Sequence, residues 1–229
     1  MKGIHASFRV VVSSNVFIKD PESSDLGQKI ISGGIDLLEE LGYENFTFKK
    51  LAKKIGTTEA SVYRYFDCKY KMLVYFVHWY WRWQEYRLLY SIANIEDPLE
   101  RLKRAIQTLT EQVQLDADFG FFNEEKLHKI VISESSKVYL NKEVEEENQA
   151  GFFHPYKDIV DRISELILIV NPNYVFPQML VSTIIEGAHH QRFFALHLPK
   201  LTNSIDNGDA ITYFYKDMIV RLIHCSTKN

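Results

Sequence analysis

Two Glu-x-x-His motifs contain the residues of this chain that could bind a metal: Glu125 with His128, and Glu186 with His189. On helices this spacing places a carboxylate and an imidazole on one face, and pairs of such motifs bind two metal ions in some helical bundles. Random placement of 18 glutamates and 8 histidines among 229 residues already gives roughly 0.6 such spacings. A di-metal carboxylate enzyme therefore remains an alternative interpretation, and we expect no cofactor and no metal.

A second chemistry is concentrated between Thr47 and Lys71, where seven basic residues accompany two acidic ones. This segment carries a charge of +5 in a chain of net charge −3, so the remainder is −8. Basic side chains displace counterions from DNA phosphates, while the acidic remainder is repelled by DNA. Four lysines on a short helix could equally form its solvated face, but the adjacent turn and the hydroxyl and aromatic residues beyond it favour DNA binding.

Helices must position these residues, because apolar side chains recur at helical spacing along the chain. Gly42 is placed to end the first helix, Thr47 to cap the second, and Gly56 to separate the second from a third over 59–65. Two short helices meeting at such a turn form a helix-turn-helix. We expect an all-α fold, with further helices over these ranges: 67–90, 97–113, 123–134, 137–148, 155–170, 174–197 and 209–225.

The helix-turn-helix residues follow a familiar pattern: Ile30-Ile31, Leu37-Leu38, Leu41-Gly42-Tyr43, Thr47, Leu51-Ala52, Gly56, Ser61-Val62-Tyr63, Tyr65-Phe66, Lys69 and Met72-Leu73. Over residues 25–75 the chain thereby resembles the tetracycline-repressor (TetR) family of bacterial transcription regulators. The resemblance implies an N-terminal three-helix DNA-binding domain that a long helix joins to a larger helical dimerisation and ligand-binding domain. It divides the chain into an extended arm (1–20), a DNA-binding domain (21–70) and a regulatory domain (71–229).

The resemblance also implies a set of DNA contacts: Thr47, Lys49, Thr58, Ser61, Tyr63, Arg64, Tyr65 and Lys69. Most would hold phosphates, since hydroxyl and ammonium groups near helix starts are common phosphate ligands. Arg64 and Tyr65 are expected at the exposed end of the recognition helix, where Arg64 could pair with guanine O6 and N7. The chain departs from the family pattern at Thr57, at Glu59-Ala60 and at Asp67-Cys68. Cys68 suggests a redox sensor, but an inert thiol is the better interpretation of a single cysteine.

Aromatic residues at helical spacing on the fourth helix suggest either a bulky core or the wall of an apolar ligand cavity. Polar residues on a later helix could orient such a ligand. The ligand-binding candidates from both helices are Tyr75, Trp79, Trp83, Tyr86, Glu186, His189 and His190. The alternative is a filled core without a ligand.

The last two long helices carry wide apolar faces. In the family such helices form an intersubunit four-helix bundle, which predicts a homodimer whose two DNA-binding units meet two operator half-sites. The predicted interface residues are Val181, Ile184, Ile185, Ala188, Ile211, Phe214, Met218 and Leu222. These residues could instead complete the core of a monomer.

Composition narrows the function classes further. With 46% apolar and 25% charged residues, 10 Gly and 6 Pro, the chain is neither disordered nor collagen-like. Two cysteines cannot build a disulfide framework, and the aliphatic run 166–170 is too short to span a bilayer. We expect a cytoplasmic transcription regulator, not an enzyme, that binds double-stranded operator DNA and is released by a small apolar or aromatic effector. A helical interaction module without DNA binding is the remaining alternative.

Overall fold

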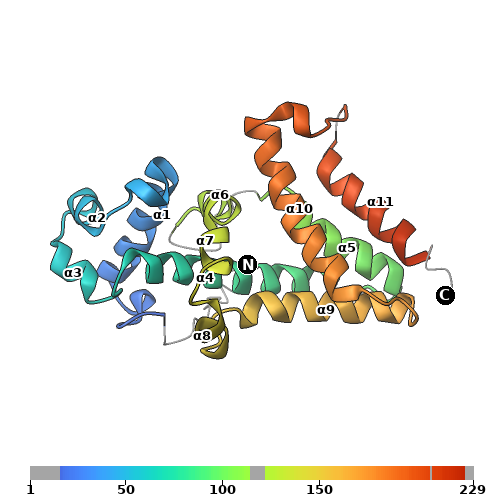
Figure 1. Cartoon of the computed structure of the whole chain (residues 1–229), viewed down its shortest axis with the longest axis horizontal. Coiled ribbons are helices and arrows are strands. Elements are labelled where there is room, and N and C mark those ends of the chain that lie inside the picture. The colour runs from blue at the N-terminus through green and yellow to red at the C-terminus, as the bar shows by residue number, and fades with distance from the viewer. Residues whose placement is uncertain (1–15, 114–121, 207, 225–229) are drawn as a thin grey trace, which may run out of the picture. The chain divides into compact units, whose positions relative to one another are not determined.

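The computed structural model describes residues 16–113, 122–206 and 208–224. These residues form α-helices and two short 3₁₀ helices, with no β-strand among them, which confirms the predicted all-α fold. The elements (Figure 1) are η1 (Pro21–Ser23), α1 (Asp25–Asn45), α2 (Phe48–Ile55), α3 (Glu59–Tyr63), α4 (Lys69–Ile92), α5 (Pro98–Thr110), α6 (Glu124–Glu134), α7 (Ser136–Tyr139), α8 (Val144–Gln149), α9 (His154–Val170), α10 (Pro177–His197), η2 (Pro199–Leu201) and α11 (Ala210–His224).

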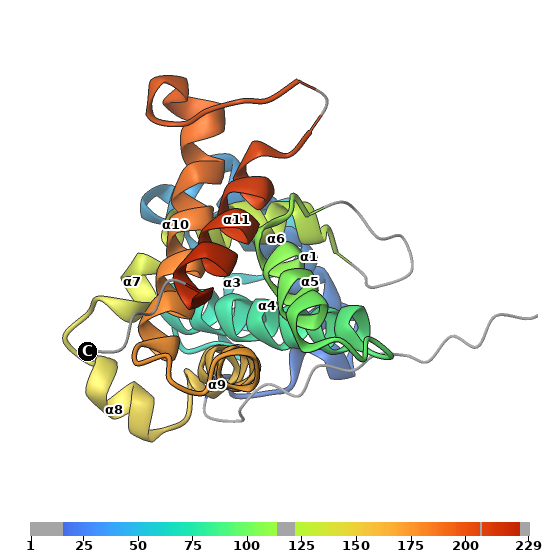
Figure 2. The ribbon, with the colours of Figure 1, turned by 90° about the vertical axis from the view of Figure 1, so that its right-hand side faces the viewer.

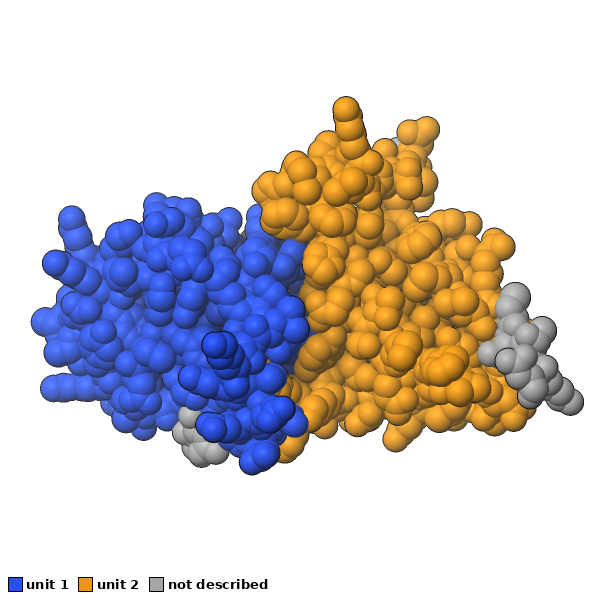
Figure 3. Space-filling model, in the orientation of Figure 1, with its two compact units in different colours: residues 1–82, 113–152 blue, residues 83–112, 153–229 orange. Residues whose placement is uncertain are grey.

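The chain divides into two compact units, which Figure 3 shows in different colours. Unit 1 comprises Met1–Arg82 and Val113–Phe152. Within it α1 packs against η1, α2 and α6. The Ser24 side chain caps the start of α1 by accepting from the Gly27 amide, and the face containing Ile30 and Leu38 is buried. Unit 1 therefore contains the complete helix-turn-helix together with α6, α7 and α8.

Unit 2 comprises Trp83–Gln112 and Phe153–Asn229. Its core is made where α5 packs against α9 and α11, and where α10 packs against α9. Figures 1 and 2 both show α10 and α11 running beside each other. The close approach of these two helices uses Gly187, because a Cβ there would collide with the hydroxyl of Tyr215.

Most predicted helices are present, and two local differences have physical causes. Gly42 does not end α1 but kinks it at φ 70° and ψ 163°, and a final turn continues to Asn45. The helix expected over 137–148 is two short helices, because Asn141 interrupts it. The Asn141 side chain donates to the Val138 carbonyl and accepts from the Glu143 amide, which replaces helical hydrogen bonding.

The extended arm predicted for residues 1–20 lies largely outside the described residues. Its described part begins at Val16, which is only 1% exposed. Within the described part of the chain no helix combines the length and the apolar character needed to cross a bilayer.

Candidate DNA-binding interface

The first helix of the helix-turn-helix, α2, buries one face and exposes its lysines. Thr47 caps it, since its Oγ1 accepts from the Lys50 amide at 3.2 Å, and Phe48 and Leu51 are buried. The four lysines of α2 are exposed, and within the described residues neither Lys49 nor Lys53 is paired with a carboxylate. Two exposed cations are therefore available to phosphates.

The recognition helix α3 is capped by Thr58, whose Oγ1 accepts from the Ser61 amide at 3.3 Å and lies 2.8 Å from the Ser61 Oγ. Gly56 ends α2 in the left-handed region, and Val62 is completely buried below α3. The two predicted phosphate-contacting hydroxyls are thus held together at the start of α3. Figure 1 shows α2 and α3 next to each other at one end of unit 1.

Tyr63 and Arg64 are both exposed at the end of the recognition helix. Tyr63 is 47% exposed, and its ring packs edge-on against that of Phe48 with centroids 5.0 Å apart. No carboxylate among the described residues is paired with Arg64, which leaves its guanidinium available for a base edge.

The exposed position expected for Tyr65 is wrong. Tyr65 is 3% exposed, and its hydroxyl lies 2.8 Å from the Ser24 Oγ, so it is bonded inside the protein rather than presented to DNA. Tyr65 lies beyond the end of α3, and its side chain turns inward toward Ser24 instead of continuing the exposed surface of Tyr63 and Arg64. Tyr65 is a structural residue, and Arg64 remains the candidate for base contact.

Lys69, which was predicted to contact a phosphate, also makes hydrogen bonds within the protein. Its Nζ donates to the carbonyl oxygens of Tyr43 at 2.9 Å and Glu44 at 3.4 Å, and it lies 4.3 Å from the centroid of the Tyr43 ring. An ammonium group has three donors, so one remains for a phosphate. Lys69 therefore joins the start of α4 to the last turn of α1.

The predicted ligand residues are divided between the units. In unit 1, the hydroxyl of Tyr75 and the indole Nε1 of Trp79 both donate to the Glu22 Oε1 at 3.0 Å. Trp83 and Tyr86 belong to unit 2, where Trp83 is 2% exposed and stacks under the Arg87 guanidinium. Tyr75 and Trp79 are consequently occupied in holding Glu22.

The polar candidates of α10 have unequal surroundings. Glu186 accepts from the Tyr156 hydroxyl at 2.9 Å. Burial, together with the neighbouring His190, lowers the pKa of His189 to about 4. His190 itself is exposed and stacks on the Phe194 ring, so a buried position in a ligand cavity is not supported for it.

The two Glu-x-x-His motifs do not form a metal centre in the described residues, where no three or more possible ligands come together. Glu125 is paired with Lys129 at 2.9 Å, and His128 Nδ1 lies 2.8 Å from the Tyr80 hydroxyl. The two motifs belong to different units. A di-metal enzyme is not favoured.

Four of the predicted interface residues are in the wrong place for a surface contact. Val181, Ile184, Ile185 and Ala188 are at most 1% exposed in the single chain, because they fill the core of unit 2. On α11, Ile211 is buried at 7% and Met218 is half-buried, whereas Phe214 is 55% and Leu222 is 42% exposed. Only the exposed residues can meet a second copy without rearrangement.

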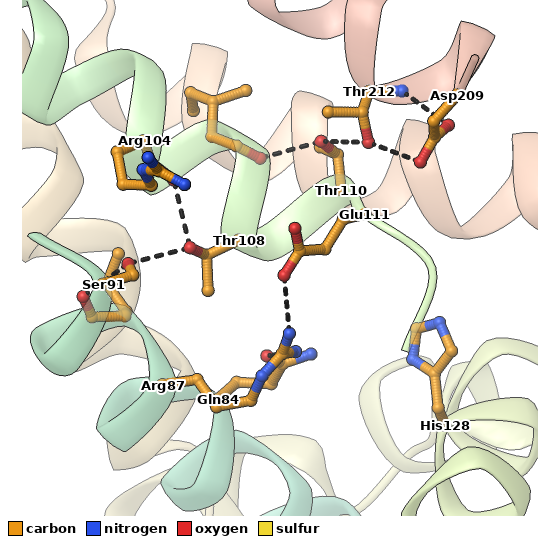
Figure 4. A network of polar contacts seen from close by, with 12 residues as sticks. Gln84, Arg87, Ser91, Arg104, Thr108, Thr110, Glu111, His128, Asp209 and Thr212 are labelled. Carbon is orange, nitrogen blue, oxygen red and sulfur yellow. Dashed lines mark hydrogen bonds and ion pairs between the residues drawn. The ribbon is translucent and has the colours of Figure 1, made fainter. Parts of the chain in front are cut away.

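A polar network that the sequence did not indicate connects the helix ends of unit 2. Figure 4 shows Arg87 bonded to Glu111, and Thr110 connected through Thr212 to Asp209. Burial would raise the pKa of Asp209, but hydrogen bonds from Arg192 and Thr212 hold that pKa below its ordinary value. The network attaches the end of α5 to α4, α10 and α11. The bonded residues Thr110 and Thr212 are 102 residues apart in the sequence, so no local pattern could predict the network.

Comparison with known proteins agrees with this geometry. Residues 30–75 match the model of the family described as bacterial regulatory proteins, tetR family. The match begins in α1, includes α2 and α3, and ends in α4. This segment of the chain therefore matches the family that the sequence resemblance indicated. The α2–α3 motif lies entirely within the matched segment. A search of curated proteins found no match.

Solved structures share the fold at low sequence identity. The structure of AibR in complex with isovaleryl coenzyme A and operator DNA is similar over 86% of this chain and 98% of that one, with 19% identity and a TM-score of 0.54. The fatty acid degradation regulator FadR from Bacillus halodurans has 18% identity over 87% of this chain and 98% of its own, with a TM-score of 0.58. PfmR from Thermus thermophilus, a TetR family transcriptional regulator, has 12% identity over 87% and 99%, with a TM-score of 0.56.

Proposed function

We propose that this chain is a one-component repressor that binds a specific DNA operator as a cytoplasmic homodimer and is released by a small effector. The observation that carries the proposal is the exposed basic helix-turn-helix within the region that matches the family. Residues 21–70 would read DNA, and residues 71–229 would dimerise and bind the effector. The chain would have no catalytic role.

At the DNA, the proposed contacts divide by chemistry. Phosphates would be held by the hydroxyls of Thr47, Thr58, Ser61 and Tyr63 and by the ammonium groups of Lys49 and Lys69, which fix the position of the protein without reading sequence. Arg64 would read a guanine edge in the major groove. Lys49 and Arg64 are exposed, and no carboxylate in the described part of the chain is paired with either, which supports this division.

The effector is proposed to be apolar or aromatic, or to carry such a group. The similar AibR structure contains isovaleryl coenzyme A, and FadR is described as a fatty acid degradation regulator, so two neighbours concern acyl compounds. In unit 2 of the present chain, Trp83, Tyr86, Glu186 and His189 remain the candidate ligand residues. Binding of effector would weaken binding of operator, and operator would weaken effector binding by the same factor.

The proposal is tested by selecting duplexes from a random library with purified full-length protein, and by repeating the selection with candidate acyl and aromatic compounds. We expect an inverted-repeat site whose affinity falls steeply as salt rises, because phosphate contacts release counterions. Enrichment of no site, or binding that is insensitive to salt, would contradict the proposed function. A selected site whose binding no compound changes would retain the DNA function and remove the effector.

A further inference from the structure

The residues that immediately precede the first long helix contact Tyr65, which follows the recognition helix, and two residues of α4. Residues 16–24, which we call the N-terminal strap, lie before the family-matched region 30–75. Val16 is 1% exposed, and the Ile18 amide donates to the Tyr65 carbonyl at 2.8 Å. The strap is therefore packed into unit 1.

The first attachment point of the strap is Tyr65, directly after α3. Its hydroxyl lies 2.8 Å from the Ser24 Oγ and 3.5 Å from the Lys19 Nζ, and the same Nζ lies 5.2 Å from the centre of the Tyr65 ring. The Tyr65 amide in turn donates to the Val62 carbonyl at 2.9 Å. The strap thus contacts the main-chain carbonyl, the hydroxyl and the ring of Tyr65, and through this residue it holds the segment that ends the recognition helix.

The second attachment point is Glu22, in η1. One carboxylate oxygen of Glu22 accepts from the Tyr75 hydroxyl and from the Trp79 indole, both at 3.0 Å. Tyr75 and Trp79 are one turn apart on α4, and both are at most 4% exposed. Hydrogen bonds to an ionised carboxylate are stronger than those between neutral groups, so Glu22 fixes the strap firmly to α4.

These contacts matter because α3 has five residues, from Glu59 to Tyr63. A helix this short has little stability of its own, and its direction depends on its neighbours. We propose that the strap sets the orientation of the recognition helix, with Glu22 and Tyr65 as positioning residues for operator binding. The inference rests on the proposed DNA-binding function and assigns to Tyr65 a role that requires no contact with DNA.

The test uses Tyr65→Phe in the full-length protein, with Tyr63→Phe as the matched control, and measures affinity for the selected operator over a range of salt. Tyr65→Phe removes only the buried hydroxyl and should weaken operator binding about three- to tenfold, the factor expected for one lost hydrogen bond. The slope of affinity against salt should remain that of the wild type, because no phosphate contact is lost. Tyr63→Phe should also keep this slope, because a neutral hydroxyl displaces no counterion, and a loss of affinity in this variant would report a direct contact of the exposed hydroxyl with a phosphate.

The other end of the strap gives an independent measurement. Glu22→Ala should weaken operator binding, whereas Glu22→Gln should restore part of it, because the amide oxygen can still accept from Tyr75 and Trp79. If Glu22→Ala does not fold, Tyr75→Phe removes one of the same hydrogen bonds from the α4 side and should show the loss.

Two results would overturn the inference, and they differ. If folded Tyr65→Phe and Tyr75→Phe bind operator as the wild type does while only their thermal midpoints fall, the strap serves stability alone. If the wild-type protein selects no duplex, the proposed function fails and the role of the strap in operator binding fails with it.

Discussion

Arg64 is the residue through which the DNA proposal is most directly tested, since it is exposed and belongs to the recognition region. Arg64→Ala should cost about 1–3 kcal/mol of operator binding and relax the preference at one base position. Competition binding against operators changed at single positions measures both effects. Arg221→Ala is the control, because this exposed arginine lies on α11 in unit 2. A uniform loss for all operators would instead indicate that Arg64 contacts a phosphate.

His189 makes the stability of the protein depend on pH. Its folded-state pKa is about 4, below the ordinary 6.5, so the unfolded chain binds a proton that the folded chain excludes. Stability is therefore complete above about pH 6.5 and falls as the pH drops toward 4, by about 2 kcal/mol between pH 7 and 5. Urea unfolding of His189→Gln at both pH values should lack most of this difference. The exposed neighbour gives the control: His190→Gln should keep it.

The residues Tyr63, Arg64 and Tyr65 show what sequence can and cannot assign at a site. The sequence after Gly56 correctly indicated a short helix, which is a local property, but this helix ends at Tyr63 and not at Tyr65 as expected. Whether each side chain points outward depends on residues that are distant in the sequence. The partner of the Tyr65 hydroxyl, for example, is Ser24, which is 41 residues away. The same reason explains Lys69, whose carbonyl partner at Tyr43 is 26 residues away. Residue type predicted which groups could contact DNA, and tertiary contacts decided which of these groups are exposed.

At the scale of the elements, the turn between α2 and α3 depends on Gly56. Its φ is 70°, in the left-handed region, and a Cβ added there would meet no atom within 4 Å. The effect of Gly56→Ala is thus one of backbone strain alone and should lower the unfolding free energy by about 1 kcal/mol. Gly56→Asn should cost less, since asparagine tolerates this conformation. Equal losses in chemical denaturation would contradict the backbone explanation.

Helix positions were predicted well where caps and apolar spacing agreed. Thr47, Asn123 and Asp97 cap helices that begin at the next residue, so the local signals were sufficient. The prediction was wrong over 137–148, because Asn141 bonds to the backbone on both sides and also donates to the Tyr70 hydroxyl, 71 residues away. A polar side chain with several possible partners cannot be assigned to a helix interior or a break from spacing alone.

At the scale of the whole molecule, apolar spacing predicted that α10 and α11 are helices, but it did not separate their buried residues from their exposed ones. Periodicity identifies which residues share a face, but it cannot separate a core from an intersubunit contact, since both are apolar. The buried Ile185 shows the consequence, because a charge at this position would disrupt the core of unit 2 and say nothing about assembly. A test of the dimer must use residues that the single chain leaves exposed.

Phe214 and Leu222 meet that requirement, at 55% and 42% exposure on α11. If they lie in a two-fold contact, Phe214→Glu and Leu222→Glu each place a charge in the contact twice, once from each copy. Burying an unpaired carboxylate is costly, so we expect a folded monomer in light scattering at micromolar concentration, where the wild type gives twice the monomer mass. Leu140→Glu is the control, because Leu140 is 84% exposed in unit 1 and should leave the dimer intact. Circular dichroism verifies that each variant is folded.

Since one helix-turn-helix covers only half of an inverted-repeat operator, the monomeric variants should also lose binding to the full site while retaining weak, salt-dependent binding to a half-site. A wild-type monomer, or variants that remain dimeric, would show that α11 does not form the interface.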